Sequence, residues 1–342
     1  MISRTLTILQ KTIIVNSILT SQIWYRAQTY PLSLDWSRKI NKIICNYIWG
    51  SKINPIKHAT LTLDKKEGGL SLVCIYTKAK SIFACRIIKQ FLIDESQNSL
   101  LFFYIAMRLN PMFNIRSLPT YICSVTTPYF EEGIGTIRNI IHINGFPNVI
   151  SKAAYEYLLD RSPPKVQERY QFSNWKNIWN NINFKYIPIR SREIVFKYLH
   201  GILPNKYRLK HIRRSDSDLC DWCNVPETNK HMVYQCQEIL EVKNFLVRLL
   251  EYFGFLNVNM IQLFLLDIPN IGKQRKNTVI FVTTLYISSI WYGRSNKTRI
   301  VSSFKSNILR EKTILEAMLK DRFTDIFTES FHVMNSNIIE SI

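Results

Sequence analysis

Three cysteines and one histidine lie close together in the second half of the chain, and their types and spacing suit metal binding. Two residues separate Cys220 from Cys223. His231 follows after seven more residues, and Cys236 after another four. Three sulfurs and one imidazole are donors that structural Zn²⁺ takes, and four protein ligands leave no position for an activated water. The spacing therefore predicts a structural zinc site; the alternative is a set of buried thiols and a core histidine.

The remaining cysteines show no comparable spacing and are predicted to be small core residues. They are Cys45, Cys74, Cys85 and Cys123. An odd total of seven cysteines, and an N-terminus without a compact apolar block, favour a reducing compartment over a secreted disulfide framework. We therefore expect an intracellular protein, nuclear or cytoplasmic.

A strongly basic stretch precedes the cysteine cluster. Residues 190–214 contain one acid, Glu193, and eight cations: Arg190, Arg192, Lys197, Lys206, Arg208, Lys210, Arg213 and Arg214. Cations contact phosphates, and Trp222 or Tyr207 could stack on an unpaired base. The alternative is a solvated helix face that supplies counter-charge to the metal site, with Trp222 packed into the core of the zinc module. The candidate nucleic-acid-binding residues are Lys206, Arg208, Lys210, Arg213, Arg214, Trp222, Lys65 and Lys66.

The charge of the whole chain points to the same class of partner. The 342 residues include 45 Lys plus Arg and 25 Asp plus Glu, a formal charge of +20. The excess is concentrated in residues 1–90, 190–214 and 272–313, which suggests an extended surface assembled by folding. Nucleic acid is the expected partner, because phosphates offset the self-repulsion of so much positive charge. With 46% apolar residues the chain has enough material for a core.

A search for catalytic patterns finds none. No Asp-Asp pair occurs, and the adjacent acids Asp94-Glu95 and Glu131-Glu132 lack the strand-turn-strand setting in which polymerases hold two metal ions. The phosphate-binding and nucleophile motifs G-x-x-x-x-G-K-[ST] and G-x-S-x-G are also missing. We therefore expect neither an enzyme nor a small-molecule substrate.

Apolar residues at three- and four-residue steps predict a mainly α fold. One predicted helix covers residues 3–29, and a second begins at the N-cap Ser33 and ends at Gly50. Its apolar face would comprise Ile40, Ile43, Ile44, Tyr47 and Ile48. Alternation around Gly68-Gly69 predicts two short extended pieces joined by a turn. Further helices are expected over 75–92, 151–160, 173–181 and 190–200.

Four regions follow from this pattern. A helical region over 1–110 leads into a proline-punctuated connection over 111–150, then a helical domain with the zinc knuckle over 151–260, and a helical C-terminal region over 261–342. The uncharged run Asn277–Gly293 is short for a membrane span, and a buried helix is predicted there. No membrane partner is expected.

The zinc-knuckle region resembles the zinc-binding domain that follows the polymerase in non-LTR (LINE-type) retrotransposon reverse transcriptases. The resemblance rests on Trp175–Trp179, Phe196–Leu209, Ser215–Cys223 and Glu227–His231. A second resemblance, to the helical thumb that follows the palm, rests on Leu6, Ile18–Tyr25, Ile44–Gly50 and Lys65–Leu70. The C-terminal remainder is similar more weakly, best over Ile290–Asn296.

The resemblance implies a non-catalytic fragment. The fingers and palm, with the aspartates that hold catalytic metals, would lie before Met1, so this chain would not polymerise DNA alone. Thumb-like region 1–110 and the zinc-binding domain would grip template RNA and target DNA. Two alternatives stay open: a zinc-stapled protein-interaction module, and a truncated gene model of an active RNA-directed DNA polymerase.

Overall fold

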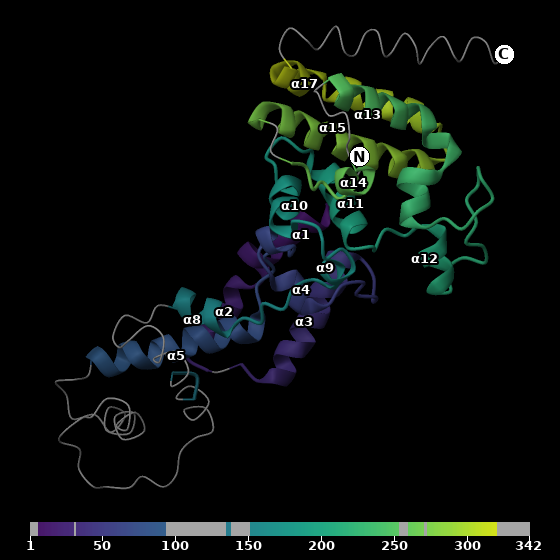
Figure 1. Ribbon diagram of the computed structural model, residues 1–342. Helices are drawn as coiled ribbons and strands as arrows, with labels where there is room; N and C mark the ends of the chain where they lie inside the picture. Colours follow the sequence, from purple (N-terminus) through teal and green to yellow (C-terminus); the bar gives the residue numbers. More distant parts are fainter. Residues whose placement is uncertain are drawn as a thin grey trace, which may run out of the picture. The chain divides into compact units, whose positions relative to one another are not determined.

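The computed structural model describes residues 6–30, 32–93, 135–137, 151–252, 259–269 and 272–319 (Figure 1). The structure divides into two compact units. The first unit comprises Met1–Leu63 and Gly69–Ser162, and the second comprises Asp64–Gly68 and Pro163–Ile342. Helices dominate both, and the described ranges contain no β-strand, so the mainly α prediction is confirmed. The predicted connection over 111–150 lies outside these ranges except for residues 135–137. The predicted domain boundaries stay predictions.

The first unit opens on a helix that is interrupted by a wider turn. Thr7 caps it, since its hydroxyl accepts from the Gln10 N–H while the Gln10 side chain accepts from the Thr7 N–H. Three segments follow each other directly, a helix, a π-helical turn and a second helix. They are α1 (Ile8–Ile14), η1 (Val15–Leu19) and α2 (Ser21–Ala27). The predicted helix over 3–29 is thus present over most of its length, with a π-turn inside it.

Helix α3 (Leu34–Trp49) has the predicted ends but not the whole predicted face. The Ser33 hydroxyl accepts from the Trp36 N–H at its start, and Gly50 ends it with φ +62°, which glycine adopts readily. Ile44 and Ile48 are buried as predicted, whereas Ile43 is 67% exposed. The prediction is wrong there because Ile43 lies about 140° around the helix from Ile48.

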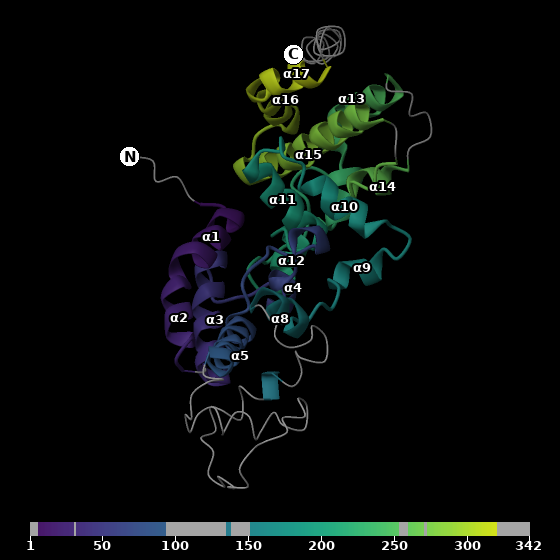
Figure 2. The same cartoon turned by 90° about the vertical axis from the view of Figure 1, so that its left-hand side faces the viewer.

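Three more helices of the first unit lie within the described ranges, besides the short helical segment 135–137. Helix α5 contacts α2, α3 and α8, which lie beside it (Figure 2). The predicted helices over 75–92 and 151–160 are confirmed. The bounds are His58–Thr62 for α4, Ile75–Ile93 for α5 and Ser151–Leu158 for α8.

The two extended pieces predicted around Gly68-Gly69 are wrong. Leu61 belongs to α4, and Lys65–Glu67 forms a 3₁₀ turn, η2. Asp64 and Glu67 make a capping box around this turn, which stabilises a helical conformation there. The alternating leucines, Leu61, Leu63, Leu70 and Leu72, are all buried without forming strands. The backbone approaches itself closely here, since a Cβ on Gly69 would lie 1.9 Å from the Leu63 carbonyl oxygen.

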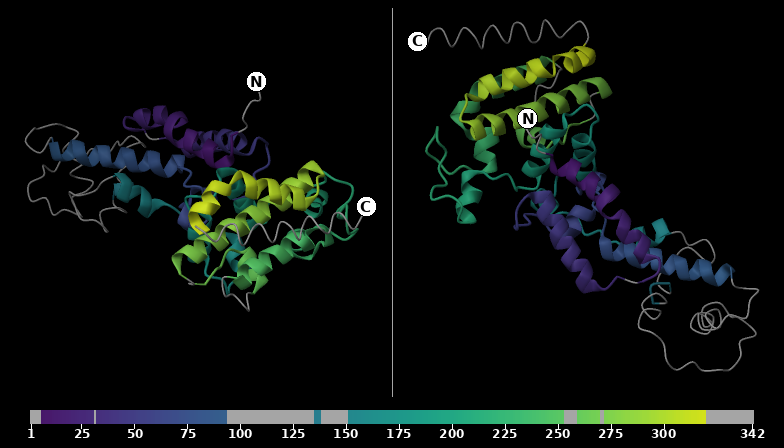
Figure 3. Two further views of the ribbon diagram at one scale, coloured as in Figure 1. Left: turned by 90° about the horizontal axis from the view of Figure 1, so that it is seen from above. Right: turned by 180° about the vertical axis from the view of Figure 1, so that it is seen from behind.

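Helix α15 (Lys273–Asn296) is the centre of the second unit. Residues 278–290 are all buried, so the buried helix predicted over 277–293 is confirmed. In the described part of the chain, no helix combines the length and apolar character that a membrane crossing requires. Around α15 pack α10, α11, α13, α14, α16, α17 and the π-helical turn η4, and α16 lies along it in Figure 3.

The remaining helices of the second unit are short to medium in length and include the predicted ones over 173–181 and 190–200. Their bounds are α9 (Lys165–Arg169), α10 (Trp175–Ile182), α11 (Ile189–Leu199), α12 (Lys206–His211), η4 (His231–Gln235), η5 (Gln237–Ile239), α13 (Leu240–Tyr252), α14 (Met260–Phe264), α16 (Ile300–Arg310) and α17 (Lys312–Leu319).

A half-buried histidine joins η2 to this unit. The His200 ring stacks on Trp179, with centroids 5.3 Å apart, and its Nε2–H donates to the Gly68 carbonyl oxygen at 2.9 Å. Burial lowers the pKa of His200 from 6.5 to about 4, although the bond to Gly68 acts in the opposite direction. The folded protein therefore holds this imidazole neutral at pH 7.

Acidification should destabilise the fold through His200. The unfolded chain takes up this proton near pH 6.5 and the folded chain near 4, so the unfolded state binds more protons in between and stability falls as pH falls. We expect a loss of about 2 kcal/mol between pH 7 and 5, measured by urea unfolding with tryptophan fluorescence. His200→Gln, which keeps an N–H donor for Gly68, should lack this part of the pH dependence. An equal loss in both proteins would contradict the assignment.

Candidate metal centre

Cys220 and Cys223 lie on a tight loop closed by backbone hydrogen bonds. The Cys220 N–H donates to the Val225 carbonyl oxygen at 2.8 Å, and the Asn224 N–H donates back to Cys220 at 3.1 Å. Asn224 has φ +53°, a left-handed conformation that asparagine tolerates better than most residues. An isolated antiparallel bridge between Leu219 and Pro226 pairs the ends of the loop. The loop therefore holds the two sulfurs on one short turn, as the spacing predicted.

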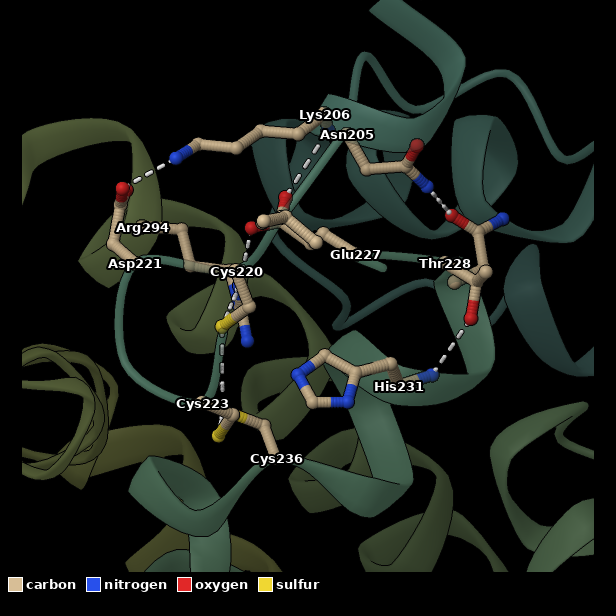
Figure 4. Close-up of polar contacts among 12 residues, drawn as sticks. Asn205, Lys206, Cys220, Asp221, Cys223, Glu227, Thr228, His231, Cys236 and Arg294 are labelled. Carbon is tan, nitrogen blue, oxygen red and sulfur yellow. Dashed lines mark hydrogen bonds and ion pairs between the residues drawn. The ribbon is translucent and has the colours of Figure 1, made fainter. Parts of the chain in front are cut away.

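His231 and Cys236 are positioned by the π-helical turn η4. The Thr228 hydroxyl accepts from the His231 N–H at 3.1 Å, which fixes the start of the turn. The Cys236 N–H donates to the His231 carbonyl oxygen at 2.9 Å and closes it. In the interior, Tyr286 of α15 donates its hydroxyl to the Val233 carbonyl oxygen at 2.8 Å. This wider turn brings residues five apart into one cluster with the loop (Figure 4).

The four donor groups converge with the dimensions of a metal site. One ligand atom from each residue lies within 4.8 Å of all the others. The Cys236 Sγ is 3.4 Å from the Cys223 Sγ and 3.9 Å from the Cys220 Sγ. Tetrahedral zinc with Zn–S bonds of about 2.3 Å separates its sulfurs by about 3.8 Å. The Nε2 of His231 is buried without a hydrogen-bond partner in the described part of the chain, so a metal ion fits the donors present.

The electrostatics of the cluster favour a bound cation. Burial favours the neutral thiol of Cys220, but the N–H groups of Trp222 and Cys223, and then Arg294, outweigh it and lower the pKa. Burial, reinforced by Cys223, raises the pKa of Cys236 to about 12. Neighbouring sulfurs thus resist joint ionisation unless a divalent ion supplies positive charge. Burial and then Arg294 lower the pKa of His231, which keeps its imidazole in the neutral, metal-binding form.

Arg294 of α15 is the cation nearest the sulfurs in the described structure. Its Nη1 lies 3.7 Å from the Cys220 Sγ and 2.7 Å from the Glu227 Oε2. The Arg294 and Glu227 side chains are only 5% and 8% exposed. The guanidinium also lies over the Trp222 ring, with its Cζ 4.9 Å from the centroid. A Cys₃His site with zinc carries a net charge of −1, so this buried arginine stabilises it directly.

The basic helix α12 is tied to the metal loop. The second oxygen of Glu227 accepts the Lys206 backbone N–H at 3.3 Å, and the Lys206 ammonium pairs with Asp221 (Figure 4). Lys210 pairs with Asp218 at 2.7 Å. These two lysines therefore supply counter-charge to the loop. This agrees with the alternative interpretation of the basic stretch, in which its cations compensate the metal site and do not contact phosphates.

The other predicted nucleic-acid-binding residues are arranged differently. Arg208 donates from Nη1 to the Gly201 carbonyl oxygen at 3.0 Å. Arg213 and Arg214, just beyond α12, are exposed, and their side chains have no hydrogen bond or ion pair within the described ranges. Lys65 and Lys66 are exposed on η2. Trp222 is 36% exposed as a residue, and Arg294 lies over its ring.

The sequence predicted the four residues that converge here but not Arg294 and Glu227 beside them. The counter-charge considered in the sequence came from the basic stretch 190–214, whereas the cation beside the sulfurs is Arg294, far along the chain. Arg294 lies in Ile290–Asn296, the segment that carries the C-terminal resemblance best. That position was the only indication in the sequence that Arg294 has a role. Glu227 begins the segment Glu227–His231, which carries part of the resemblance, but the sequence predicted no role for it.

Comparison with known proteins gives a family for this part of the chain. No curated protein matched the sequence. Residues 150–242 match the family model described as zinc-binding in reverse transcriptase. The match contains all four converging residues and ends before α15, so Arg294 lies outside it. The match and the Cys₃His group together support a reverse transcriptase zinc-binding domain over residues 150–242.

Proposed function

We propose that this chain is a non-catalytic, zinc-stabilised part of a LINE-type reverse transcriptase that grips template RNA, target DNA or both. The family match carries the reverse transcriptase assignment. The LINE type rests on the order of two resemblances, thumb-like region before zinc-binding domain. The absence of paired aspartates in this sequence supports a binding role without catalysis. An intracellular location, nuclear or cytoplasmic, belongs to the same proposal.

The metal in this proposal is structural zinc held by Cys220, Cys223, His231 and Cys236. Closed four-ligand zinc sites of this composition stabilise folds and leave no position for a substrate. Zinc would hold the loop and η4 together and thereby fix the start of α12, through Glu227 and Lys206. The basic residues that follow α12 would then have a defined position.

The observation that carries nucleic-acid binding is the pair of exposed arginines beyond α12. The Arg213 N–H donates to Lys210 and the Arg214 N–H to Leu209, so the backbone of both is fixed. Their guanidinium groups have no acidic partner among the described residues and are available to phosphates. Phosphate contacts position a nucleic acid without reading its sequence, so the binding should tolerate different sequences.

Replacing Arg213 and Arg214 by alanine should weaken binding to unrelated nucleic acids about equally. Each lost phosphate contact should reduce the slope of log K against log salt by about 0.7 to 0.9. Fluorescence anisotropy between about 50 and 200 mM salt measures both affinity and slope. Lys152→Ala with Lys176→Ala removes the same charge from exposed positions outside the three basic regions, and should change little. A flat salt response, or a loss restricted to one sequence, would contradict this mechanism.

The ion pairs of α12 favour a second candidate, a zinc-stapled module that binds another protein. Lys206 and Lys210 already have acidic partners, which reduces the charge that α12 offers to phosphates. The same titration separates the two functions, because such a module would not bind nucleic acid with the salt dependence described above.

A further inference from the structure

The second unit contains a half-open cavity of about 240 Å³ that neither the zinc site nor the basic residues beyond α12 use. It lies where the ends of α9 and α11 meet η4 and α14. Four aromatic side chains line it, and two cations stand among them. The aromatic residues are Tyr170, Tyr198, Tyr234 and Phe264, and the cations are Arg169 and Lys230.

The walls of this cavity are preformed. Phe264 stacks on Tyr286 with centroids 5.4 Å apart, and its ring meets Tyr234 edge to face at 6.1 Å. Tyr234 belongs to η4, the same turn that carries His231. The Cys236 N–H bond that closes η4 and the Tyr286 bond to Val233 therefore hold one wall in place. A ligand would meet rings that are already ordered, which lowers the entropic cost of binding.

The lining is suited to a flat aromatic group attached to an anion. Pockets for drug-sized ligands occupy about 300 to 1,000 Å³, so this cavity suits a smaller, single ring system. Tyrosine and phenylalanine rings stack on nucleobases of any sequence. Arg169 and Lys230 are exposed, and their side chains form no hydrogen bond or ion pair within the described part of the chain. They are thus free to contact phosphates at the cavity.

We propose that this cavity receives one unpaired base of a single-stranded nucleic acid, with its flanking phosphates on Arg169 and Lys230. The inference rests on the proposed nucleic-acid-binding function and adds to it a base-stacking site apart from Arg213 and Arg214. Contact with an unpaired base would direct the domain to single strands, because bases in a duplex are already stacked and paired.

The test compares two aromatic residues that are close in sequence but differ in position. Tyr170 is 36% exposed and lines the cavity, whereas Phe172 is fully exposed and does not. Tyr170→Ala keeps the backbone carbonyl that accepts the Trp175 Nε1–H at 3.0 Å, so the local fold should persist. Tyr170→Phe keeps the ring, and Phe172→Ala is the matched control.

The zinc-loaded variants of the whole 342-residue chain would be titrated with single-stranded RNA, single-stranded DNA, and an abasic strand of equal length. We expect Tyr170→Ala to weaken binding to base-containing strands about 5- to 100-fold, as loss of one stacking contact does. Binding to the abasic strand should be unchanged, and Tyr170→Phe and Phe172→Ala should bind like the unsubstituted protein. If Tyr170→Ala loses affinity for both RNA and DNA, the cavity recognises the base alone. If it loses affinity for RNA only, the site also recognises the 2′-hydroxyl. Both results support the site.

Three results would overturn the proposal. Equal weakening by Tyr170→Ala and Phe172→Ala, or an equal loss with the abasic strand, would mean that no base enters the cavity. Ultraviolet cross-linking of the unsubstituted chain gives a readout that does not depend on whether a variant folds. Cross-links confined to peptides outside the cavity would also show that no base enters it. If the unsubstituted protein binds none of the strands, the proposed function itself fails, whereas the first three results leave it standing.

Discussion

Replacing Cys220 and Cys223 together by serine should abolish stoichiometric zinc binding and unfold the loop between α12 and η4. The two remaining donors, His231 and Cys236, cannot complete a tetrahedral site. Structural zinc contributes on the order of 10 kcal/mol of apparent binding free energy to local folding, more than a small loop can replace. Elemental analysis should give about one zinc per unsubstituted chain and none for the variant. Hydrogen exchange should increase over residues 205–239.

Cys74→Ser is the matched control for this experiment. The Cys74 sulfur lies 3.2 Å from the Thr77 hydroxyl in the first unit, a contact that serine can keep. This variant should retain both zinc and exchange protection. Full zinc stoichiometry in the double variant would show that the ligand assignment is wrong.

The convergence of these four side chains could be predicted from sequence because its geometry is largely local. Cys220 and Cys223 share one turn, and His231 and Cys236 share another, so short-range spacing carries most of the site. The helix ends at Ser33 and Gly50 were predictable for the same reason, since caps depend on neighbouring residues. Composition identified α15 as buried, because an uncharged run too short for a membrane needs a protein core.

What the sequence could not supply depends on contacts between distant segments. The pairing of Lys206 with Asp221 and of Lys210 with Asp218 requires α12 to lie against the metal loop. Charge counting alone made these lysines candidates for phosphate binding. The exposure of Ile43 reflects which side of α3 meets its neighbours, a choice that tertiary packing makes. The η2 turn replaced the predicted extended pieces because a local capping box outweighed an alternating pattern.

The role of Arg294 leads to the second large effect. Arg294→Gln should weaken zinc binding about 10- to 100-fold, because it removes the cation that lies against Cys220 and Glu227. It also leaves Glu227 buried without its partner, which costs about 3 to 5 kcal/mol in folding free energy. Arg294→Lys should recover part of both losses, since it keeps the charge but not the forked geometry. Competition with a chromophoric chelator measures the affinity, and urea unfolding measures the stability.

A second substitution separates metal stabilisation from a merely structural ion pair. If Arg294 served only Glu227, combining Arg294→Gln with Glu227→Gln would restore zinc affinity fully. We expect partial recovery, because the thiolate charge would still lack its cation. Arg275→Gln removes the same charge from an exposed position on α15 and should leave zinc affinity unchanged. Since binding and folding are linked, removing zinc should also increase hydrogen exchange around residue 294. The zinc-dependent unit would then extend beyond residue 242 into the C-terminal helices, and unchanged exchange there would limit it to the matched segment.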